Sequence, residues 1–188
     1  MDCYFGNNIG SSNSSRYYKY QNIKEKAKLF ATNAHKGQVR KAFQDKPMIT
    51  HPINVAEIIS EYNFDDNVIS AGYLHDVIED TKYTKEDLLK EFNDDIVSLV
   101  LGDTEKDKNL SWEERKTITI NEVKDLDLRH KAVVCADKIS NLEDLKLLFA
   151  IKGEKDFSAF KRGYDKQKWY YTEIYNSLIH NEDSNYPM

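Results

Sequence analysis

The segment that constrains the structure most strongly reads Val68-Ile-Ser-Ala-Gly-Tyr-Leu-His-Asp-Val-Ile-Glu-Asp80, an apolar run that ends in four ionisable side chains. With His75 set to zero on a helix of about 100° per residue, Glu79 falls at about 40° and Asp76 at about 100°. Asp80 falls at about 140°, so the four share one arc while the apolar positions point into a core. A histidine buried beside three carboxylates is unfavourable unless a cation or a substrate compensates the charge. The segment therefore predicts a metal-dependent active site.

The composition is that of an ordinary globular domain. The 188 residues suit one domain with a sizeable core, and 40% are hydrophobic and 31% charged. Three prolines and seven glycines favour helices over turn-rich β architecture. The net charge of −5 produces a field that repels nucleic acid and anionic membranes, so we expect neither as a partner. Two cysteines, no signal peptide and no long apolar run predict a cytoplasmic protein.

The chain divides into three parts. Residues 1–20 are rich in polar and small side chains and are expected to form a disordered leader, followed by one domain over 21–180 and a tail over 181–188. No segment alternates with a strand period over a useful length, and we find no repeat and no interdomain linker. The fold class predicted is all-α, a single helical bundle.

Capping residues set the expected helix boundaries. Thr84 and Ser111 each precede a carboxylate by three residues, at Asp87 and Glu114, which is typical of a capping box. Gly153 is expected to end the longest helix. The predicted helices cover residues 21–36, 53–62, 67–80, 85–92, 94–101, a segment from 112, 128–150 and 157–180, with a loop over 38–50.

Two further residues extend the ionisable group at the end of the first segment. His51 precedes Pro52 at a helix start, and Asp137 lies inside the most apolar helix, where an unpaired carboxylate is expensive. With His75 and Asp76 they give two imidazoles and two carboxylates. This donor set suits manganese, iron or zinc rather than calcium or a thiolate zinc site.

Each added residue also has a simpler explanation. His51 fits the start of a helix as a cap, and Asp137 fits as an ion-pair partner of Lys138 or Arg129. Several such coincidences would have to occur together in one chain, so the metal site is favoured.

Four motifs resemble the HD-type hydrolase domain of the RelA/SpoT alarmone enzymes, in that family's order and approximate spacing. They are Ala34-His-Lys-Gly-Gln-Val-Arg-Lys41, Pro47-Met-Ile-Thr-His-Pro52, Tyr73-Leu-His-Asp-Val-Ile-Glu-Asp-Thr81 and Ala136-Asp-Lys-Ile-Ser-Asn-Leu142. The likeness covers roughly residues 21–180 and is greatest to the stand-alone small alarmone hydrolases, which include the animal SpoT homologue and short bacterial relatives. It implies a single HD-domain helical bundle.

The resemblance implies roles for the site residues. Glu79 and Asp80 match the acidic pair with which the family orients and deprotonates the attacking water. The expected ligands of one manganese ion, with other divalent transition metals as alternatives, are His51, His75, Asp76 and Asp137.

The resemblance also implies a substrate-binding set. Arg40 and Lys41 match the basic pair that packs on the guanine and faces the phosphates, and Asn141 matches an asparagine near the nucleoside. His35 matches a histidine that is not a metal ligand and is expected to support the structure. Asp144 stands where the long enzymes have a threonine near the nucleotide.

Other polar and aromatic residues are kept outside the predicted site. Two further positions depart from the family pattern, at Met48 and Lys138. Helical surface charge explains Lys116, Lys161 and Arg162 as well as phosphate binding does. The late aromatic residues are expected to lie in the core; they are Tyr164, Trp169 and Tyr171.

The resemblance implies hydrolysis of guanosine tetra- and pentaphosphate (ppGpp and pppGpp) at the 3′ position, which releases pyrophosphate and leaves GDP or GTP. One alternative is a metal-dependent phosphatase acting on NADPH or a nucleoside monophosphate. A second is a non-catalytic domain that senses alarmones, although a sensor has no need of Glu79. A nuclease ranks third because the chain is acidic and lacks a broad basic face.

Overall fold

The computed structural model describes residues 22–41, 43–105, 107–153 and 162–182, so the expected leader over 1–20 lies outside the described residues. The described chain is helical apart from one short hairpin, which confirms the predicted class. The elements in chain order are α2 (Ile23–Ala34), β1 (Val39–Arg40), β2 (Phe43–Pro47), α3 (Thr50–Ser60), α4 (Asp66–Leu74), α5 (Val77–Asp80), α6 (Lys85–Glu91), α7 (Asp94–Asp103), α8 (Trp112–Lys124), α9 (Leu128–Lys152) and α10 (Gly163–Leu178).

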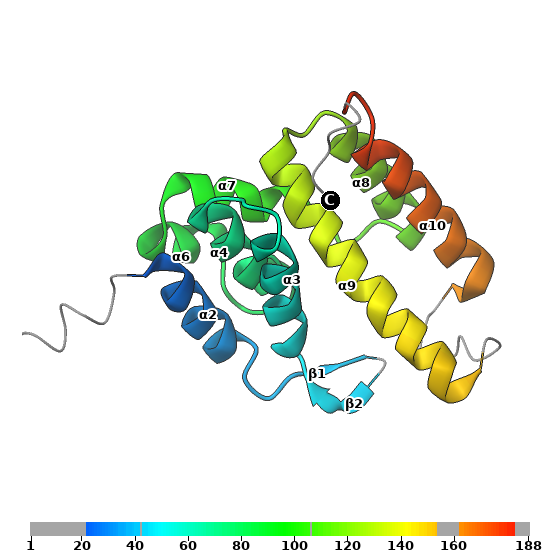
Figure 1. Ribbon diagram of the computed structural model, residues 1–188, viewed down its shortest axis with the longest axis horizontal. Coiled ribbons are helices and arrows are strands. Elements are labelled where there is room, and N and C mark those ends of the chain that lie inside the picture. The colour runs from blue at the N-terminus through cyan, green and yellow to red at the C-terminus, as the bar shows by residue number, and fades with distance from the viewer. Residues whose placement is uncertain (1–21, 42, 106, 154–161, 183–188) are drawn as a thin grey trace, which may run out of the picture.

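The long helix α9 runs through the middle of the molecule (Figure 1). Helices α3, α4 and α7 pack against one side of α9, and α2 packs on α4 behind them. Helices α8 and α10 pack against each other on the other side of α9, and the β1–β2 hairpin lies near one end of α3. The bundle therefore has two parts that share α9.

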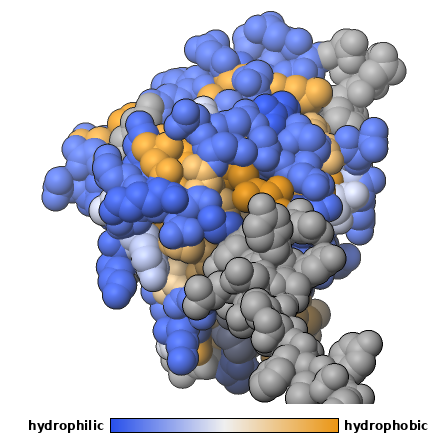
Figure 2. Space-filling model, turned by 90° about the vertical axis from the view of Figure 1, so that its left-hand side faces the viewer, coloured by the Kyte–Doolittle hydropathy of each residue, from blue (hydrophilic) through white to orange (hydrophobic). Residues whose placement is uncertain are grey.

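The outer face of the first part is mainly hydrophilic. Figure 2 views the side on which α2 and α6 lie, and apolar side chains gather there between charged ones. Among the described helices, none combines the length and the apolar character that a membrane span requires.

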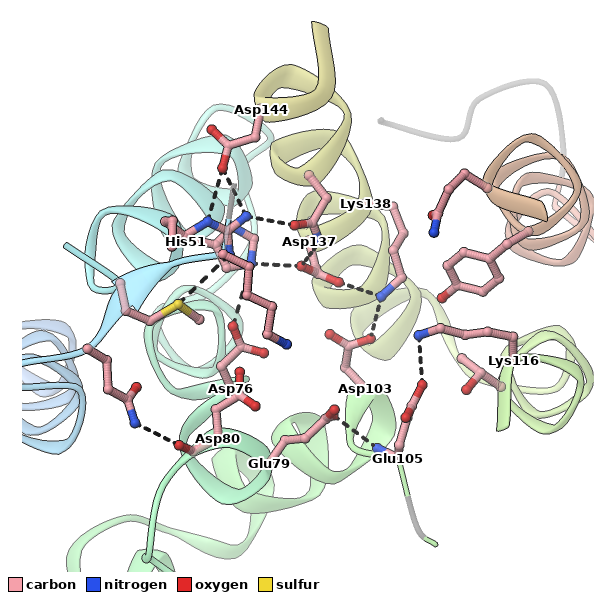
Figure 3. A pocket seen from close by; sticks show the side chains of 18 of the residues that line it. His51, Asp76, Glu79, Asp80, Asp103, Glu105, Lys116, Asp137, Lys138 and Asp144 are labelled. Carbon is pink, nitrogen blue, oxygen red and sulfur yellow. Dashed lines mark hydrogen bonds and ion pairs between the residues drawn. The ribbon is translucent and has the colours of Figure 1, made fainter. Parts of the chain in front are cut away.

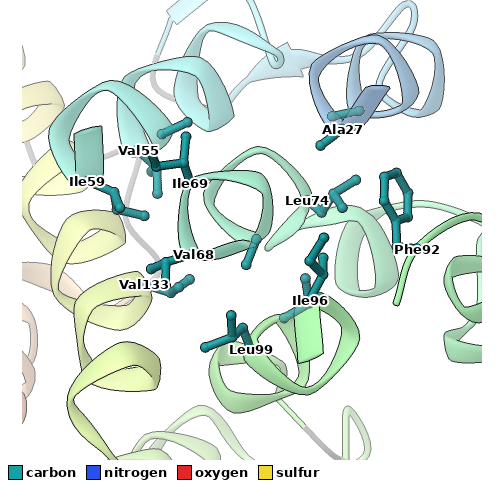
Figure 4. Close-up of a cluster of buried hydrophobic side chains, with 14 of the residues drawn as sticks. Ala27, Val55, Ile59, Val68, Ile69, Leu74, Phe92, Ile96, Leu99 and Val133 are labelled. Carbon is teal, nitrogen blue, oxygen red and sulfur yellow. The ribbon is translucent and has the colours of Figure 1, made fainter. Parts of the chain in front are cut away.

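Two hydrophobic clusters hold the bundle together. In the larger one, Leu74, Val68 and Ile59 are fully buried among side chains from α2, α3, α7 and α9 (Figure 4). The smaller cluster joins α8, α9 and α10 through residues that include Val134 and Ile174. Because every hydrophobic side chain of α4 from Val68 to Leu74 except that of Tyr73 is buried, α4 is the central helix of the first part.

A glycine allows α3 and α4 to approach each other closely. A Cβ atom on Gly72 would lie 2.8 Å from Ile59 Cδ1, closer than real Cβ atoms come to a neighbour, and 3.1 Å from Ala56 Cα, which is tighter than most Cβ contacts. This contact places the start of α3 beside the end of α4, the two segments that carry His51 and His75.

The helix caps that depend on residues close together in the sequence are present as predicted. The Thr84–Asp87 and Ser111–Glu114 capping boxes both form, and Gly153, with φ 84°, follows the last residue of α9. Side chains of this kind satisfy the first N–H groups of a helix, which have no partner inside it.

Several boundaries differ from the prediction. Helix α3 covers Thr50–Ser60 rather than 53–62, α2 ends at Ala34 rather than at residue 36, and α9 extends to Lys152. The expected loop over 38–50 contains the antiparallel hairpin, in which Val39 faces Pro47 and Arg40 faces Phe43 with an irregular register between them. Strands this short show no detectable alternation of apolar and polar residues in the sequence. The predicted helix over 67–80 is interrupted, because α4 ends at Leu74 and only the four-residue α5 follows. Helix α7 continues two residues past the expected end, to Asp103.

The aromatic prediction for the end of the chain was partly wrong. Tyr164 is 53% exposed on α10, because it lies in the first turn, beyond the edge of the smaller cluster. Trp169 and Tyr171 are partly buried and pack against that cluster. The expected start of this helix at residue 157 lies outside the described residues.

Candidate active site

The two predicted histidines meet at the bottom of a cavity. His51, in the first turn of α3, and His75, directly after α4, place their Nε2 atoms 3.2 Å apart. Asp137 of α9 brings Oδ1 to 2.9 Å from His51 Nε2 and 3.6 Å from His75 Nε2. One donor atom from each of the three residues lies within 4.8 Å of the others, a spacing that can hold a metal ion.

Asp76 completes the predicted ligand group from the side. Its Oδ2 lies 3.3 Å from His75 Nε2 and 3.6 Å from His51 Nε2. His75 and Asp76 form the short turn between α4 and α5, and both keep right-handed helical backbone angles. Their side chains therefore lie within one arc of about 100° and reach the same point.

The outer nitrogens of both imidazoles are fixed by hydrogen bonds. His75 Nδ1 donates to the carbonyl oxygen of Gly72 at 2.9 Å, which directs Nε2 toward the centre. His51 Nδ1 lies 2.9 Å from Ser140 Oγ, which also accepts from Asn54 Nδ2 at 3.0 Å. Metal-binding histidines in proteins are usually oriented in this way. Two Nε2–H groups cannot face each other at 3.2 Å, so at least one of these nitrogens carries no proton and can bind a cation.

The carboxylates make the centre strongly anionic. Burial lowers the pKa of His75, but the neighbouring Asp76 and Asp137 outweigh it and hold that pKa well above its ordinary value. Burial raises the pKa of Asp137, but Lys138 and the two imidazoles bring it well below its usual range. Burial raises the pKa of Asp76, but His75 and His51 outweigh it and lower that pKa, so both aspartates are ionised at neutral pH and available to a cation.

Asp137 is held in place by a partly buried lysine. Lys138 Nζ donates to Asp137 Oδ2 and lies 3.2 Å from Asp103 Oδ1. The ion pair considered as an alternative for Asp137 is thus present, but it uses only Oδ2 and leaves Oδ1 facing the imidazoles. Arg129, the other partner considered, pairs with Asp65 and Asp95 instead.

Glu79 lies beside this centre in an environment that disfavours its charge. Burial, Glu105 and Asp76 raise the pKa of Glu79 to about 7. The main-chain N–H of Glu105 donates to Glu79 Oε2 at 3.3 Å and fixes the side chain. A carboxylate with a pKa near neutrality exchanges protons readily at physiological pH, as general acid–base catalysis requires. Asp80 follows on the same turn and lines the cavity (Figure 3).

The predicted substrate residues lie at one end of the cavity. Arg40 and Asn141 are joined by a hydrogen bond of 2.9 Å from Arg40 Nη2 to Asn141 Oδ1, although they are 101 residues apart in the chain. Asn141 Nδ2 donates to Asp137 Oδ1 at 2.6 Å, which connects this end to the metal ligands. The side chain of Lys41 is exposed at the rim.

All the predicted site residues except His75 line one cavity of about 690 Å³, a size suited to a nucleotide. His75 is buried beneath it, against His51. The structure therefore brings together residues from β1, α3, α5 and α9 and from the short turn between α4 and α5.

The wall opposite His51 was largely missed by the sequence prediction. Lys116 of α8 points into the cavity and pairs with Glu105 at 2.7 Å, and Tyr171 of α10 also lines it (Figure 3). Asp103 was missed as well. The one local signal in the sequence for the inward orientation of Asp103 is its position at the end of the apolar face of α7. Lys161 lies outside the described residues, and Arg162 pairs with Glu113 on the surface.

His35 has a supporting position, in agreement with its expected role. Its side chain is buried, and its Nδ1 lies 2.8 Å from Gln38 Oε1. Gln38 in turn donates to the main-chain oxygen of Asp80 at 2.8 Å. The motif that contains His35 thus fixes the hairpin against α5.

Known proteins share both the sequence pattern and the fold. The model of the HD domain family matches residues 27–156. The guanosine-3′,5′-bis(diphosphate) 3′-pyrophosphohydrolase MESH1 of Drosophila melanogaster is 39% identical over 120 residues, which cover 63% of this chain and 66% of that protein. The enzyme of the same activity from Haemophilus influenzae is 35% identical over 123 residues, 62% of this chain and 18% of its own. The chain thus spans just under two thirds of the fly protein and less than a fifth of the bacterial one.

Two solved structures are similar over most of their length. The structure of lmo0812 from Listeria monocytogenes EGD-e has 43% sequence identity and a TM-score of 0.69, and covers 72% of this chain and 88% of that one. A metazoan orthologue of SpoT, described as hydrolysing ppGpp, has 30% identity and a TM-score of 0.75. The match covers 88% of this chain and 89% of that one. These matches confirm the likeness to the RelA/SpoT hydrolase domains that the motifs predicted. This chain belongs to the HD domain family.

Proposed function

We propose that this protein is a metal-dependent hydrolase that removes the 3′-pyrophosphate from ppGpp and pppGpp, leaving GDP or GTP. The observation that carries the proposal is the convergence of two imidazoles and two aspartates beside Glu79, in a cavity of nucleotide size. Relatives that carry this activity by name match 63% and 62% of this chain, and the HD domain model matches residues 27–156, which include the site.

The donor set supports one manganese ion held by His51, His75, Asp76 and Asp137. These residues offer two imidazole nitrogens and carboxylate oxygens, with no thiolate among them. Such a mixture suits manganese, while iron or zinc would also be accepted. A divalent metal bound there supplies Lewis acidity, which makes a water molecule a better nucleophile and polarises the phosphoryl oxygen.

Glu79 acts as the general base in this proposal. Its pKa of about 7 lets it take a proton from the attacking water at neutral pH, and the Glu105 N–H holds it in position. Asp80, the next residue in the chain, orients the water or receives the second proton. A general base contributes about 10²–10⁴-fold, so electrostatic stabilisation must supply the larger share of the rate.

Cationic groups at two ends of the cavity complete the substrate site. Arg40, Lys41 and Asn141 lie at the end nearer the hairpin and would contact the guanine nucleoside. Lys116 lies at the opposite end and would meet a phosphate chain. Lys41 at the rim and Lys116 leave a cation towards each end of the cavity for a nucleotide that carries phosphates on two ribose positions.

The extent and location of the protein are also proposals. We place the hydrolase domain at residues 21–180, of which the structure describes 22–41, 43–105, 107–153 and 162–180. We infer a cytoplasmic location, because Cys135 is unpaired and nucleotide substrates are abundant there.

Product analysis tests the proposal. Purified protein is incubated with Mn²⁺ and, separately, with ppGpp, pppGpp, ppApp and NADPH, and the products are separated by anion exchange. We expect equimolar GDP and pyrophosphate from ppGpp, and no turnover by the Asp137→Asn variant. Orthophosphate release from NADPH with none of the alarmones hydrolysed would identify a phosphatase instead. Tight ppGpp binding without turnover would identify a sensor.

A further inference from the structure

Arg40 is enclosed by acceptors that occupy the edges of its guanidinium group. Arg40 Nε donates to Asp144 Oδ2 at 3.0 Å, Nη2 reaches the same oxygen at 2.9 Å, and Nη2 also donates to Asn141 Oδ1. Nη1 lies 3.9 Å from Met48 Sδ. A guanidinium whose N–H edges are directed at protein groups offers a ligand mainly its planar face.

Asp144 binds a second cation at the same time. Its Oδ1 accepts from Lys46 Nζ of β2 at 2.8 Å, and only 14% of its side chain is exposed. Burial raises the pKa of Asp144, but Lys46 and Arg40 outweigh it and lower that pKa. One ionised carboxylate therefore neutralises part of the positive charge that the hairpin brings to the cavity.

This contact is continuous with the metal ligands through α9. Asp137, Asn141 and Asp144 lie at positions i, i+4 and i+7, and so on one face of the helix. Asn141 links them, since its Nδ2 binds Asp137 and its Oδ1 binds Arg40. The orientation of Arg40 is thus set relative to the reacting centre, and Figure 3 shows Asp144 above this group.

We propose that Asp144 is a positioning residue that determines ligand class at this end of the cavity. It holds Arg40 so that the guanidinium plane stacks on a planar ring, and it withholds the charges of Arg40 and Lys46 from a phosphate group. The site then selects a ligand that carries a nucleobase over a free polyphosphate. The inference rests on the proposed function only in taking a nucleotide as the ligand.

The test compares two ligands that have the same number of phosphates, one with a nucleoside and one without. Calorimetric titration of the metal-free protein with GDP and with inorganic pyrophosphate gives a ratio of affinities. Wild-type protein is expected to prefer GDP. In Asp144→Asn, pyrophosphate binding should strengthen about fivefold from the lost negative charge. The GDP to pyrophosphate ratio should fall about threefold to thirtyfold as ring stacking is lost.

The neighbouring carboxylate provides a matched control. Glu143 lies next to Asp144 on α9 but accepts a hydrogen bond from Asn54 Nδ2 at 2.8 Å. Glu143→Gln should keep the ratio within about twofold of wild-type, and Asp144→Ser carries the same expectation as Asp144→Asn. Thermal unfolding of each variant checks that it is folded.

Several outcomes would overturn the proposal. A wild-type protein without preference for GDP contradicts it, and so does an equal loss of both affinities in Asp144→Asn, which would indicate a purely structural role. An unchanged ratio in both Asp144 variants contradicts it as well. Because these titrations involve no turnover, a failure of ppGpp hydrolysis would overturn the proposed function separately.

Discussion

Glu79→Gln is expected to leave metal binding intact and to remove both turnover and the acidic limb of the pH–rate profile. Burial, Glu105 and Asp76 raise the pKa of Glu79 to about 7 from the ordinary 4.5. The difference corresponds to about 3 kcal/mol against ionisation of this carboxyl group. A base must be unprotonated to act, so activity should rise with pH through this pKa.

The size of the effect follows from the ionised fraction. With a pKa of about 7, about a tenth of Glu79 is ionised at pH 6 and about nine tenths at pH 8, so kcat/KM should rise about tenfold between them. A bound divalent cation favours the ionised form, which places the midpoint of the loaded enzyme at or below 7. An unperturbed glutamate would give almost no change over this range.

The assay is kcat/KM for ppGpp from pH 5.5 to 9 at saturating Mn²⁺, for wild-type protein, Glu79→Gln and Glu105→Gln. Removing the charge of Glu105 lowers the pKa of Glu79, so its limb should move to lower pH. Glu79→Gln should lose about 10²–10⁴-fold in kcat with the metal still bound. Wild-type turnover in Glu79→Gln, or an unchanged acidic limb in that variant, would refute the assignment of Glu79 as the base.

Three further predictions concern the metal centre and the core. Asp137→Asn should abolish Mn²⁺ binding in calorimetry because it removes the anionic oxygen that faces both imidazoles, and wild-type affinity would contradict this. Lys138→Met should weaken Mn²⁺ binding about 10–100-fold, since the ammonium that holds Asp137 Oδ2 is lost, and an affinity equal to wild-type would show that Lys138 has no positioning role. Leu74→Ala should lower the free energy of unfolding by about 2–5 kcal/mol in urea denaturation, because Leu74 is fully buried in the larger cluster, and a loss well under 1 kcal/mol would contradict that packing.

The features predicted well from the sequence are those with local causes. The capping boxes at Thr84 and Ser111 and the glycine after α9 depend on residues a few positions apart, so each is legible in the chain itself. The residues of the candidate metal site were recognisable for another reason. Burying an aspartate such as Asp137 in an apolar helix costs free energy unless the carboxylate has a partner. The same holds for the ionisable residues that follow the apolar run of α4.

The features that were missed depend on contacts between distant segments. Arg40 and Asp144 are 104 residues apart, and Lys138 meets Asp103 from another helix, so neither pairing leaves a trace in local spacing. The break between α4 and α5 was missed because helical periodicity continues through it in the sequence. The hairpin was missed because its strands are too short to show alternation.

Crystals of the protein loaded with Mn²⁺ would locate the metal by its anomalous scattering. One peak is expected within bonding distance of His51 Nε2, His75 Nε2 and Asp137 Oδ1, with an Asp76 oxygen beside it. A peak at another place in the protein, or none there in a sample that binds Mn²⁺ stoichiometrically, would contradict the metal centre on which the proposed hydrolysis depends.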